Sequence, residues 1–313
     1  MDRIVVIVGP TASGKTGLSV ALAKKLRGEV ISADSMQIYR GMDVGTAKVT
    51  PEEMDGVPHH MIDVAEPEEA FSAARFVEMA DPILQDILAR GKTAVIAGGT
   101  GLYVDALIQG RAFAPHPDTG KRETLEREAD RLGMEHMLAR LREIDPDSAA
   151  RLHLSDRKRI LRALEVYEET GKTITQHNLE TRAVPPKYDP VWIGLAFRNR
   201  EDLYRRINRR VDRMLEQGLL KEIAGLLDRG VPESATAMQA IGYKEFLPVL
   251  AGQIPPEEAA EQVKRGSRRY AKRQLTWFRK NEKIHWILQE DPPDPGAVLA
   301  EALRLIPFFD GEA

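Results

Sequence analysis

The chain has 313 residues, 42% of them hydrophobic, which is enough for one large domain or two smaller ones. It has no cysteine, which excludes disulfides, thiolate metal sites and cysteine nucleophiles. The formal net charge of −3 argues against a general nucleic-acid binder, but residues 111–290 carry 34 Lys and Arg against 28 Asp and Glu. We therefore expect any polyanionic partner to contact the second half.

The first 110 residues alternate apolar runs with helical patterns. Residues 3–8 (RIVVIV), 29–33 and 92–97 are typical of strands buried on both faces, and residues 15–26 and 73–91 have helical spacing. This order predicts an α/β fold with a P-loop parallel sheet and helices on both faces. The N-terminus does not resemble a signal peptide and no stretch is long enough to span a membrane, so we expect a cytoplasmic protein.

The pattern changes after Gly110. We expect residues 1–113 to form the first part of the core and residues 114–187 an inserted, all-helical lobe, which begins with the linker APHPDTG. Residues 188–313 would complete the core, with a strand at 191–197, basic helices to Asn281 and a possible last strand at 283–288.

The clearest motif is GPTASGKT, between the first strand and the first helix. Its glycines let successive N–H groups face phosphate oxygens at a helix N-terminus, Lys15 adds a cation, and Thr16 offers a hydroxyl to the phosphate or to Mg²⁺. The loop predicts a diphosphate or triphosphate ligand but not the reaction. The residues expected to bind it are Gly9, Pro10, Thr11, Ala12, Ser13, Gly14, Lys15 and Thr16.

Two further positions end strands of the expected sheet. Asp34 follows the second strand, so its carboxylate should lie near the phosphate loop, where it could hold a metal, accept a proton or simply cap a turn. Thr100, in GGTGLY after the third strand, either touches substrate or belongs to a tight turn. The sequence lacks an acidic residue where a nucleotide hydrolase usually places its Mg²⁺-binding aspartate on that strand.

Three helices combine cationic rows with aromatic or apolar residues. They span residues 155–171, 203–218 and 263–281, and Arg206 and Arg210 share one face of the second. Such rows suit an RNA backbone with bases stacked on rings, although each alone could be a solvated helix face. We also expect Arg206 and Arg210 to reach the diphosphate.

Taken together, the motifs GPTASGKT, ISADSMQIYRGMDVGTAK, PHHMID, GGTGLY, RILRALEVYEETG, IGYKEF and KRQLTWFRK resemble those of the bacterial tRNA dimethylallyltransferases along nearly the whole chain. The resemblance implies transfer of a dimethylallyl group from dimethylallyl diphosphate to the exocyclic N6 amine of the adenosine 3′-adjacent to the anticodon. It also implies Mg²⁺ as cofactor and the anticodon stem-loop of tRNA as partner. We expect a monomer.

Residue roles follow from the same resemblance. Asp34 corresponds to the general base, Lys15 and Thr16 to catalytic contacts on the diphosphate, Thr16 to the Mg²⁺ ligand acting through it, and Thr100 to a further catalytic position. The implied tRNA-binding residues are Asp34, Ser35, Met36, Gln37, Thr100, Glu123, Lys158, Arg159, Ile160, Leu161, Arg162, Ile241, Gly242, Tyr243, Lys244, Lys272, Arg273, Gln274, Trp277 and Arg279.

Other functions share part of this pattern. A P-loop kinase of a small metabolite would use the same loop and Asp34, but it gives no role to the basic second half. A non-catalytic, nucleotide-switched RNA-binding protein would use the basic helices and hydrolyse nucleotide slowly. A transferase acting on free adenine nucleotides would not need the helical lobe. The zinc finger of eukaryotic relatives is excluded because the chain lacks cysteine.

Overall fold

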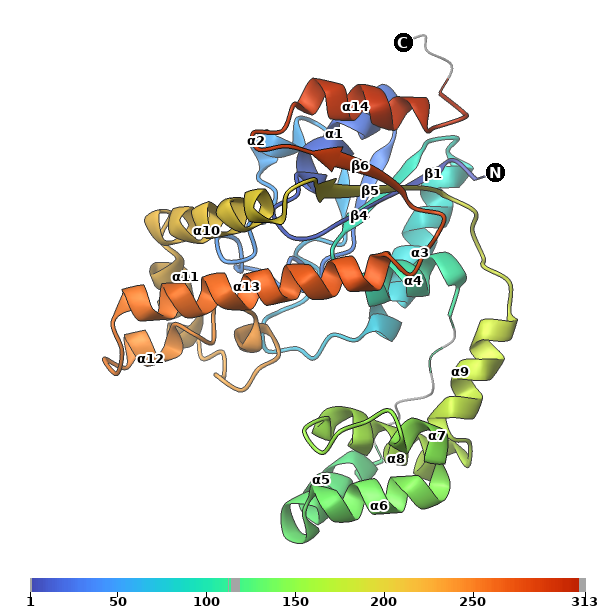
Figure 1. Ribbon diagram of the computed structural model, residues 1–313, viewed down its shortest axis with the longest axis vertical. Coiled ribbons are helices and arrows are strands. Elements are labelled where there is room, and N and C mark those ends of the chain that lie inside the picture. Colours follow the sequence, from blue (N-terminus) through green and yellow to red (C-terminus); the bar gives the residue numbers. More distant parts are fainter. Residues whose placement is uncertain (1, 112, 114–118, 310–313) are drawn as a thin grey trace. The chain divides into compact units, whose positions relative to one another are not determined.

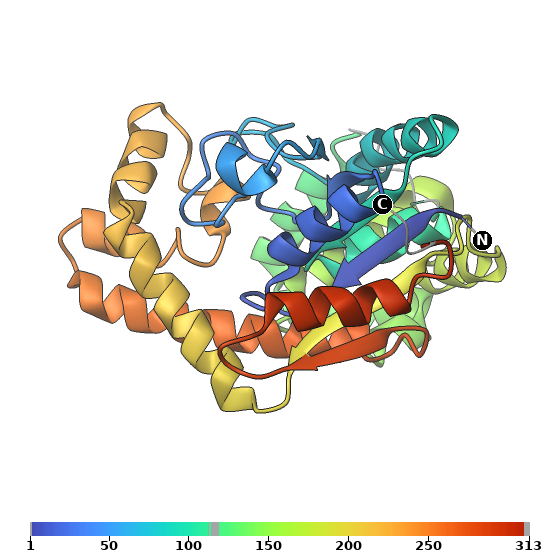
Figure 2. The ribbon, with the colours of Figure 1, turned by 90° about the horizontal axis from the view of Figure 1, so that it is seen from above.

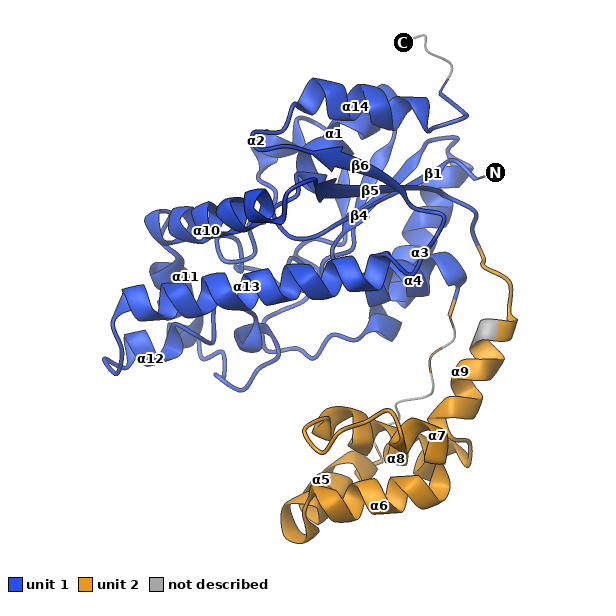
Figure 3. Ribbon diagram, in the orientation of Figure 1, with its two compact units in different colours: residues 1–110, 188–313 blue, residues 111–187 orange. Residues whose placement is uncertain are grey.

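The structure is a computed structural model that describes residues 2–111, 113 and 119–309, apart from the side chain of Arg182 (Figure 1). The chain forms two compact units, one of residues 1–110 with 188–313 and one of residues 111–187 (Figure 3). Among the described residues, no helix has the length and apolar character needed to cross a bilayer.

A single six-stranded parallel sheet organises the first unit. Its order is β3-β2-β4-β1-β5-β6, so the two strands that neighbour β1 arrive from distant parts of the chain. Val6 at the centre of β1 pairs with Ile96 on one side and Trp192 on the other. The prediction of an α/β parallel sheet is confirmed. The strands are β1 Ile4–Val8, β2 Glu29–Ser32, β3 His59–His60, β4 Ala94–Gly98, β5 Val191–Phe197 and β6 His285–Gln289.

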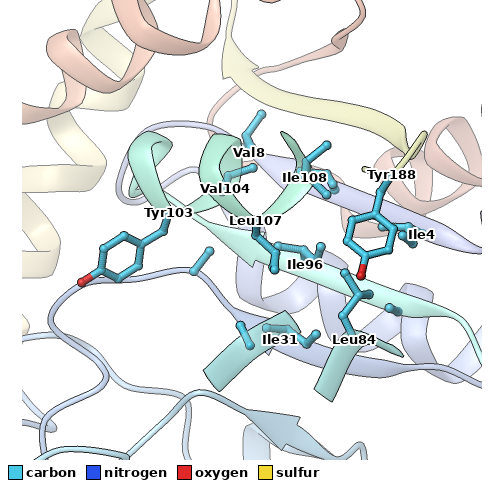
Figure 4. Packing of buried hydrophobic residues seen from close by; sticks show 14 of the residues in the cluster. Ile4, Val8, Ile31, Leu84, Ile96, Tyr103, Val104, Leu107, Ile108 and Tyr188 are labelled. Carbon is cyan, nitrogen blue, oxygen red and sulfur yellow. The ribbon is translucent and has the colours of Figure 1, made fainter. Parts of the chain in front are cut away.

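Helices cover both faces of the sheet, as expected. On β1, Ile4, Val6 and Val8 pack into one core cluster with residues of α3 and α4, whereas Val5 and Ile7 pack into another with α1 and α14. Figure 4 shows the first of these clusters at close range. A continuous apolar run is therefore required, because both faces of the strand are buried. The helices are α1 Lys15–Lys25, α3 Ala73–Ala89, α4 Gly101–Gln109 and α14 Pro295–Arg304.

The edge strand β3 has only two residues and no apolar signal, and sequence reasoning missed it. His60 Nε2 lies 2.8 Å from Glu29 Oε2 at the start of β2. Hydrogen bonds from Arg90, Lys92 and His60 outweigh burial and hold the pKa of Glu29 well below its usual range. Side-chain pairing, rather than hydrophobic burial, thus fixes this short edge.

The remaining helices of the first unit assemble beside the sheet, where α10 packs against α13 (Figure 2). A third core cluster joins them to the loop after β2, with Tyr39, Met42, Tyr243 and Phe246 almost fully buried. This packing brings α10 and α13 against the segments that leave β1 and β2. The elements are α2 Pro51–Met54, α10 Arg200–Glu216, α11 Leu219–Asp228, the 3₁₀ turn Ala237–Gln239, α12 Leu247–Leu250 and α13 Pro256–Phe278.

The second unit is helical over its described residues. Its core includes Ile160 and Leu161, both 0% exposed, so neither side chain is available for the RNA contact expected from the sequence. Tyr167, on the same helix as Ile160 and Leu161, is 38% exposed. The helices are α5 Lys121–Leu132, α6 Met134–Ile144, α7 Pro146–Ala149, α8 Arg157–Thr170 and α9 Ile174–Ala183.

One carboxylate holds the loop that follows β2. Glu222 on α11 accepts the backbone N–H groups of residues 43, 44 and 45 at 2.8, 2.7 and 3.0 Å and the Tyr243 hydroxyl at 2.6 Å. A Cβ on Gly45 would lie 2.5 Å from the Tyr243 ring, so only glycine fits there. The loop is thereby fixed where its next residues, Thr46 and Ala47, meet the site described below.

We expect Glu222→Ala to lower the free energy of unfolding by about 2–4 kcal/mol, because it leaves three backbone donors and a buried hydroxyl without their acceptor. Urea denaturation measures the change. Asp228→Ala, an exposed carboxylate on the same helix, is the control and should change stability by less than about 0.5 kcal/mol. Equal effects of the two substitutions would contradict this role of Glu222.

Candidate active site

The phosphate loop occupies the carboxyl end of β1. Gly9 has a φ of 148°, and a Cβ there would lie 2.5 Å from the Leu195 carbonyl oxygen of β5. Gly14, directly before α1, has a φ of 90°. Both positions therefore need glycine, one for close backbone approach and one for its conformation. The loop leads into a helix N-terminus, whose free N–H groups favour an anion.

Three cationic side chains surround this loop. Lys15 Nζ donates to the Pro10 carbonyl at 2.8 Å, and Arg206 Nε donates to the Ala12 carbonyl at 3.1 Å. Arg210 donates to the Thr46 carbonyl at 2.9 Å. Arg206 thus contacts the phosphate loop, and both arginines line the cavity that contains it, while their expected contact with diphosphate stays a prediction.

Burial lowers the pKa of two of these cations, Lys15 and Arg210. Desolvation lowers the pKa of Lys15 to about 8, against the opposing effect of the Asp34 carboxylate. Desolvation also lowers the pKa of Arg210, again with Asp34 acting in the opposite direction. Positive charge held in a poorly hydrated site stabilises a bound anion more strongly than the same charge in water would.

Asp34 stands just after β2, and its two carboxylate oxygens have different surroundings. Its Oδ1 accepts the backbone N–H of Met36 at 2.9 Å and of Gln37 at 3.4 Å, which makes it the turn residue considered from the sequence. Within the part of the chain that the structure describes, Oδ2 accepts no hydrogen bond. One oxygen therefore shapes the turn while the other remains able to accept a proton.

Hydrogen bonds of Thr100, directly before α4, and of Tyr270 and Gln274 on α13 hold this turn and the phosphate loop. We call these three residues the clasp. Thr100 Oγ1 accepts the Ser35 N–H at 3.0 Å, so its hydroxyl reaches across to β2 instead of capping α4. Gln274 accepts the Thr11 N–H at 2.8 Å and donates to the Gly99 carbonyl at 3.0 Å. The Tyr270 hydroxyl interacts with both Thr100 and Gln274, and burial raises the pKa of Tyr270 to about 12.

Two cavities meet at Asp34. The larger, about 740 Å³, contains Lys15, Thr16 and the arginines of α10, and the smaller is about 350 Å³. Both are lined by Thr11, Asp34, Arg210 and Tyr270. The smaller cavity also collects several residues expected to bind tRNA, namely Ser35, Met36, Ile241, Tyr243, Lys244 and Arg273.

Gln37 belongs to the larger cavity instead. Its amide donates to the Thr46 and Ala47 carbonyls at 3.4 and 3.3 Å. The side chain therefore braces the loop held by Glu222 and also lines the cavity that contains the phosphate loop.

The other residues expected to bind tRNA differ in exposure. Gln274 and Tyr243 are 6% and 0% exposed, with their polar groups engaged in the clasp and on Glu222, and Gly242 is buried. The Gln274 amide is therefore committed to Thr11 and Gly99, and its expected contact with RNA stays a prediction. Trp277 is 40% exposed and donates its indole N–H to Asp105 at 2.8 Å. Fully exposed candidates are Lys244, Lys272, Arg273 and Arg279 in the first unit and Glu123, Lys158 and Arg159 in the second.

Arg162 of the second unit is half-buried and donates to Glu165 at 3.0 Å.

Sequence reasoning also missed contributors to the larger cavity. Arg209 and Arg213 line it beside Arg206 and Arg210, because residues three and four positions apart share one face of α10. Their helical spacing was a visible signal, whereas nothing local marked Tyr270 or Gln274 as neighbours of the phosphate loop.

Comparisons with known proteins agree with this geometry. A family model described as IPP transferase matches residues 37–281. The tRNA dimethylallyltransferase of Symbiobacterium thermophilum is 50% identical over 305 residues, which cover 97% of this chain and 94% of that one. The enzyme of the same name from Caldanaerobacter subterraneus subsp. tengcongensis is 48% identical over 92% of each chain.

Solved structures give the same result. The tRNA isopentenylpyrophosphate transferase of Bacillus halodurans superposes with a TM-score of 0.71 at 43% identity and covers 99% of each chain. A eukaryotic dimethylallyltransferase acting on tRNA has a TM-score of 0.80 at 32% identity, over 92% of this chain and 74% of that one. With its family match, its close relatives and these folds in agreement, the chain belongs to the IPP transferase family, that of the tRNA dimethylallyltransferases.

Proposed function

We propose that this protein transfers the dimethylallyl group of dimethylallyl diphosphate to the N6 amine of the adenosine 3′-adjacent to the anticodon in tRNA. The observation that carries the proposal is the position of Asp34 between two cavities, one lined by the phosphate loop and the other by Ser35, Met36 and Lys244. The larger cavity, with the phosphate loop, and the smaller cavity, which we propose faces RNA, thus share one carboxylate, that of Asp34.

The diphosphate end of the reaction needs charge stabilisation. As the allylic C–O bond breaks, negative charge grows on the departing diphosphate, and the loop N–H groups with Lys15 and Arg210 are already oriented to receive it. The Thr16 hydroxyl, exposed at the start of α1, fits a Mg²⁺ ion shared with diphosphate oxygens, since Mg²⁺ binds few protein ligands when phosphates are present. When bound, the ion would neutralise part of the diphosphate charge.

The acceptor end needs a base. The N6 amine of adenine is a weak nucleophile because its lone pair is delocalised into the ring. As N6 bonds to the allylic carbon, Asp34 Oδ2 takes its proton, and diphosphate leaves with the electrons of the C–O bond. The adenosine must leave the base stack to enter the smaller cavity, where Ser35 and Met36 border Asp34.

RNA binding would use the exposed cations. In the first unit, Lys272, Arg273 and Arg279 stand on or just after α13, and Arg273 lies 5.4 Å from the Tyr270 ring. In the second unit, Lys158 and Arg159 stand on α8. These side chains suit phosphate contacts, which give affinity and salt dependence rather than base specificity.

The first expected outcome concerns the reaction itself. Incubation with dimethylallyl diphosphate, Mg²⁺ and unmodified tRNA should yield N6-dimethylallyladenosine, detected by mass analysis of the digested nucleosides, with one diphosphate released per transfer. A kinase would instead move the γ-phosphate of ATP to a small metabolite, and a nucleotide switch would form no product. Modification of free adenosine monophosphate in place of tRNA would also contradict the proposal.

Asp34→Asn is the sharpest test of the base. Asparagine keeps a carbonyl oxygen for the Met36 and Gln37 N–H groups, so the turn survives, but it does not accept the proton. We expect the single-turnover rate to fall by roughly 10²-fold or more, with tRNA affinity within about threefold of the parent protein. Asp86→Asn, at an exposed carboxylate on α3, is the control. A mutant that retains most of its rate would remove Asp34 from the base role.

Lys15 gives a pH dependence. Its pKa of about 8 means that it is cationic below that pH and loses its proton above it. Affinity for dimethylallyl diphosphate, measured by titration calorimetry, should therefore weaken as pH rises through about 8. In Lys15→Met this step should disappear and turnover should fall roughly a hundredfold, about 3 kcal/mol in the barrier. Lys25→Met, on the exposed end of α1, should keep the parent profile. A persistent step in Lys15→Met would assign it to another group.

A further inference from the structure

The end of β6 contacts the phosphate loop, although the two segments lie near opposite ends of the sequence. Gln289, the last residue of β6, is 6% exposed, and its Nε2 donates to the Ser13 carbonyl at 3.0 Å. The two residues are 276 positions apart in sequence. A buried amide that donates to a loop carbonyl restricts the orientation of that peptide.

Asp291, two residues later, acts on the neighbouring peptide through α10. Its side chain is 6% exposed and pairs with Arg206 at 3.4 Å, with Arg205 at 3.9 Å and with Arg209. Arg206 in turn donates Nε to the Ala12 carbonyl at 3.1 Å and lies 5.5 Å from the Phe197 ring. The Arg206 guanidinium therefore has three partners: the Ala12 carbonyl, the Phe197 ring and the Asp291 carboxylate. Only the last of these contacts is an ion pair.

These contacts determine where the anion-binding donors point. In a planar trans peptide the C=O and the following N–H are directed oppositely. A carbonyl of Ala12 turned towards Arg206 thus turns the Ser13 N–H the other way, and a carbonyl of Ser13 turned towards Gln289 does the same for the Gly14 N–H. Both carbonyls are tied to residues outside the loop, so both N–H groups remain directed away from those ties.

Asp291 also neutralises part of the positive charge of the α10 arginines. Arg206 and Arg209 line the larger cavity and stand one helical turn apart, with Arg205 beside them. Like charges this close repel one another, and the carboxylate that they share offsets this repulsion, although Arg205 pairs with Asp202 as well. Removal of the carboxylate would let these side chains separate and would release Arg206 from its place on Ala12.

We propose that Gln289 and Asp291 are positioning residues of the diphosphate site, acting through the Ser13 carbonyl and through Arg206. The inference rests on the proposed function, because it takes diphosphate as the ligand of the loop. Both residues lie beyond residues 37–281, the span matched by the family model. The last strand of the sheet therefore contributes to binding as well as to the core.

The neighbouring residue offers a matched control. Glu290 stands between the two, but its side chain is 80% exposed and its ionic contact is Arg198 at 4.0 Å. Glu290→Gln removes the same charge from the same turn without touching the loop or Arg206.

The experiment measures the affinity of inorganic diphosphate with Mg²⁺ by titration calorimetry, in the full chain without tRNA. Asp291→Asn should weaken this affinity about tenfold, Asp291→Glu should recover part of the loss, and Glu290→Gln should match the parent. In steady-state assays, Asp291→Asn should raise the KM for dimethylallyl diphosphate by a similar factor and leave the KM for tRNA within about twofold. A merely structural role would not separate the two KM values.

Unchanged or tighter diphosphate binding by Asp291→Asn would overturn the inference, since the carboxylate would then only neutralise charge or stabilise the fold. Gln289→Leu, which keeps the volume and removes the amide donor, is the second variant and decides the matter if Asp291→Asn does not fold. It should weaken diphosphate binding severalfold, and parent-like binding would overturn the inference. Failure of the parent protein to bind diphosphate would refute the proposed function instead.

Discussion

A cluster of desolvated cations at the end of β1 is the constraint on which the rest of the structure depends. Lys15 and Arg210 are both held where burial lowers the pKa, with the Asp34 carboxylate opposing that shift. Such a cluster is unfavourable without a negatively charged ligand. The fold therefore holds at this site a charge arrangement that a bound anion would stabilise. In the proposed reaction that anion is diphosphate, and the fixed charges lower the barrier to breaking the allylic bond.

Elements distant in sequence keep this cluster in place. Gln274 of α13 ties the phosphate loop to the Gly99 carbonyl, Arg206 of α10 ties it to Asp291, and Gln289 of β6 ties it to the sheet edge. Each tie uses a polar group that burial would otherwise leave unsatisfied, so the loop and its supports form together. The catalytic geometry is consequently a property of the whole first unit.

Asp34 connects the two halves of the chemistry because its two oxygens have different surroundings. Oδ1 is committed to the N–H groups of Met36 and Gln37, which fixes the carboxylate plane, while Oδ2 accepts no hydrogen bond from the described residues and Asp34 lines both cavities. The same turn carries Ser35, whose N–H is held by Thr100. In the proposed reaction, a carboxylate positioned so firmly loses little entropy when it accepts the proton of the adenosine amine.

The parallel sheet, the phosphate loop and the position of Asp34 beside it were predictable from the amino-acid order. Apolar runs, glycine spacing and the meeting of strand ends at one edge are local or topological properties. The motifs also carried the resemblance to the family. The folded chain was needed to show that Gln274 contacts the phosphate loop, that Ile160 and Leu161 belong to a core, and that Glu222, Gln289 and Asp291 hold the loops around the site. These contacts join residues far apart in the chain, and no periodicity or local motif records which side chain a distant backbone group will meet.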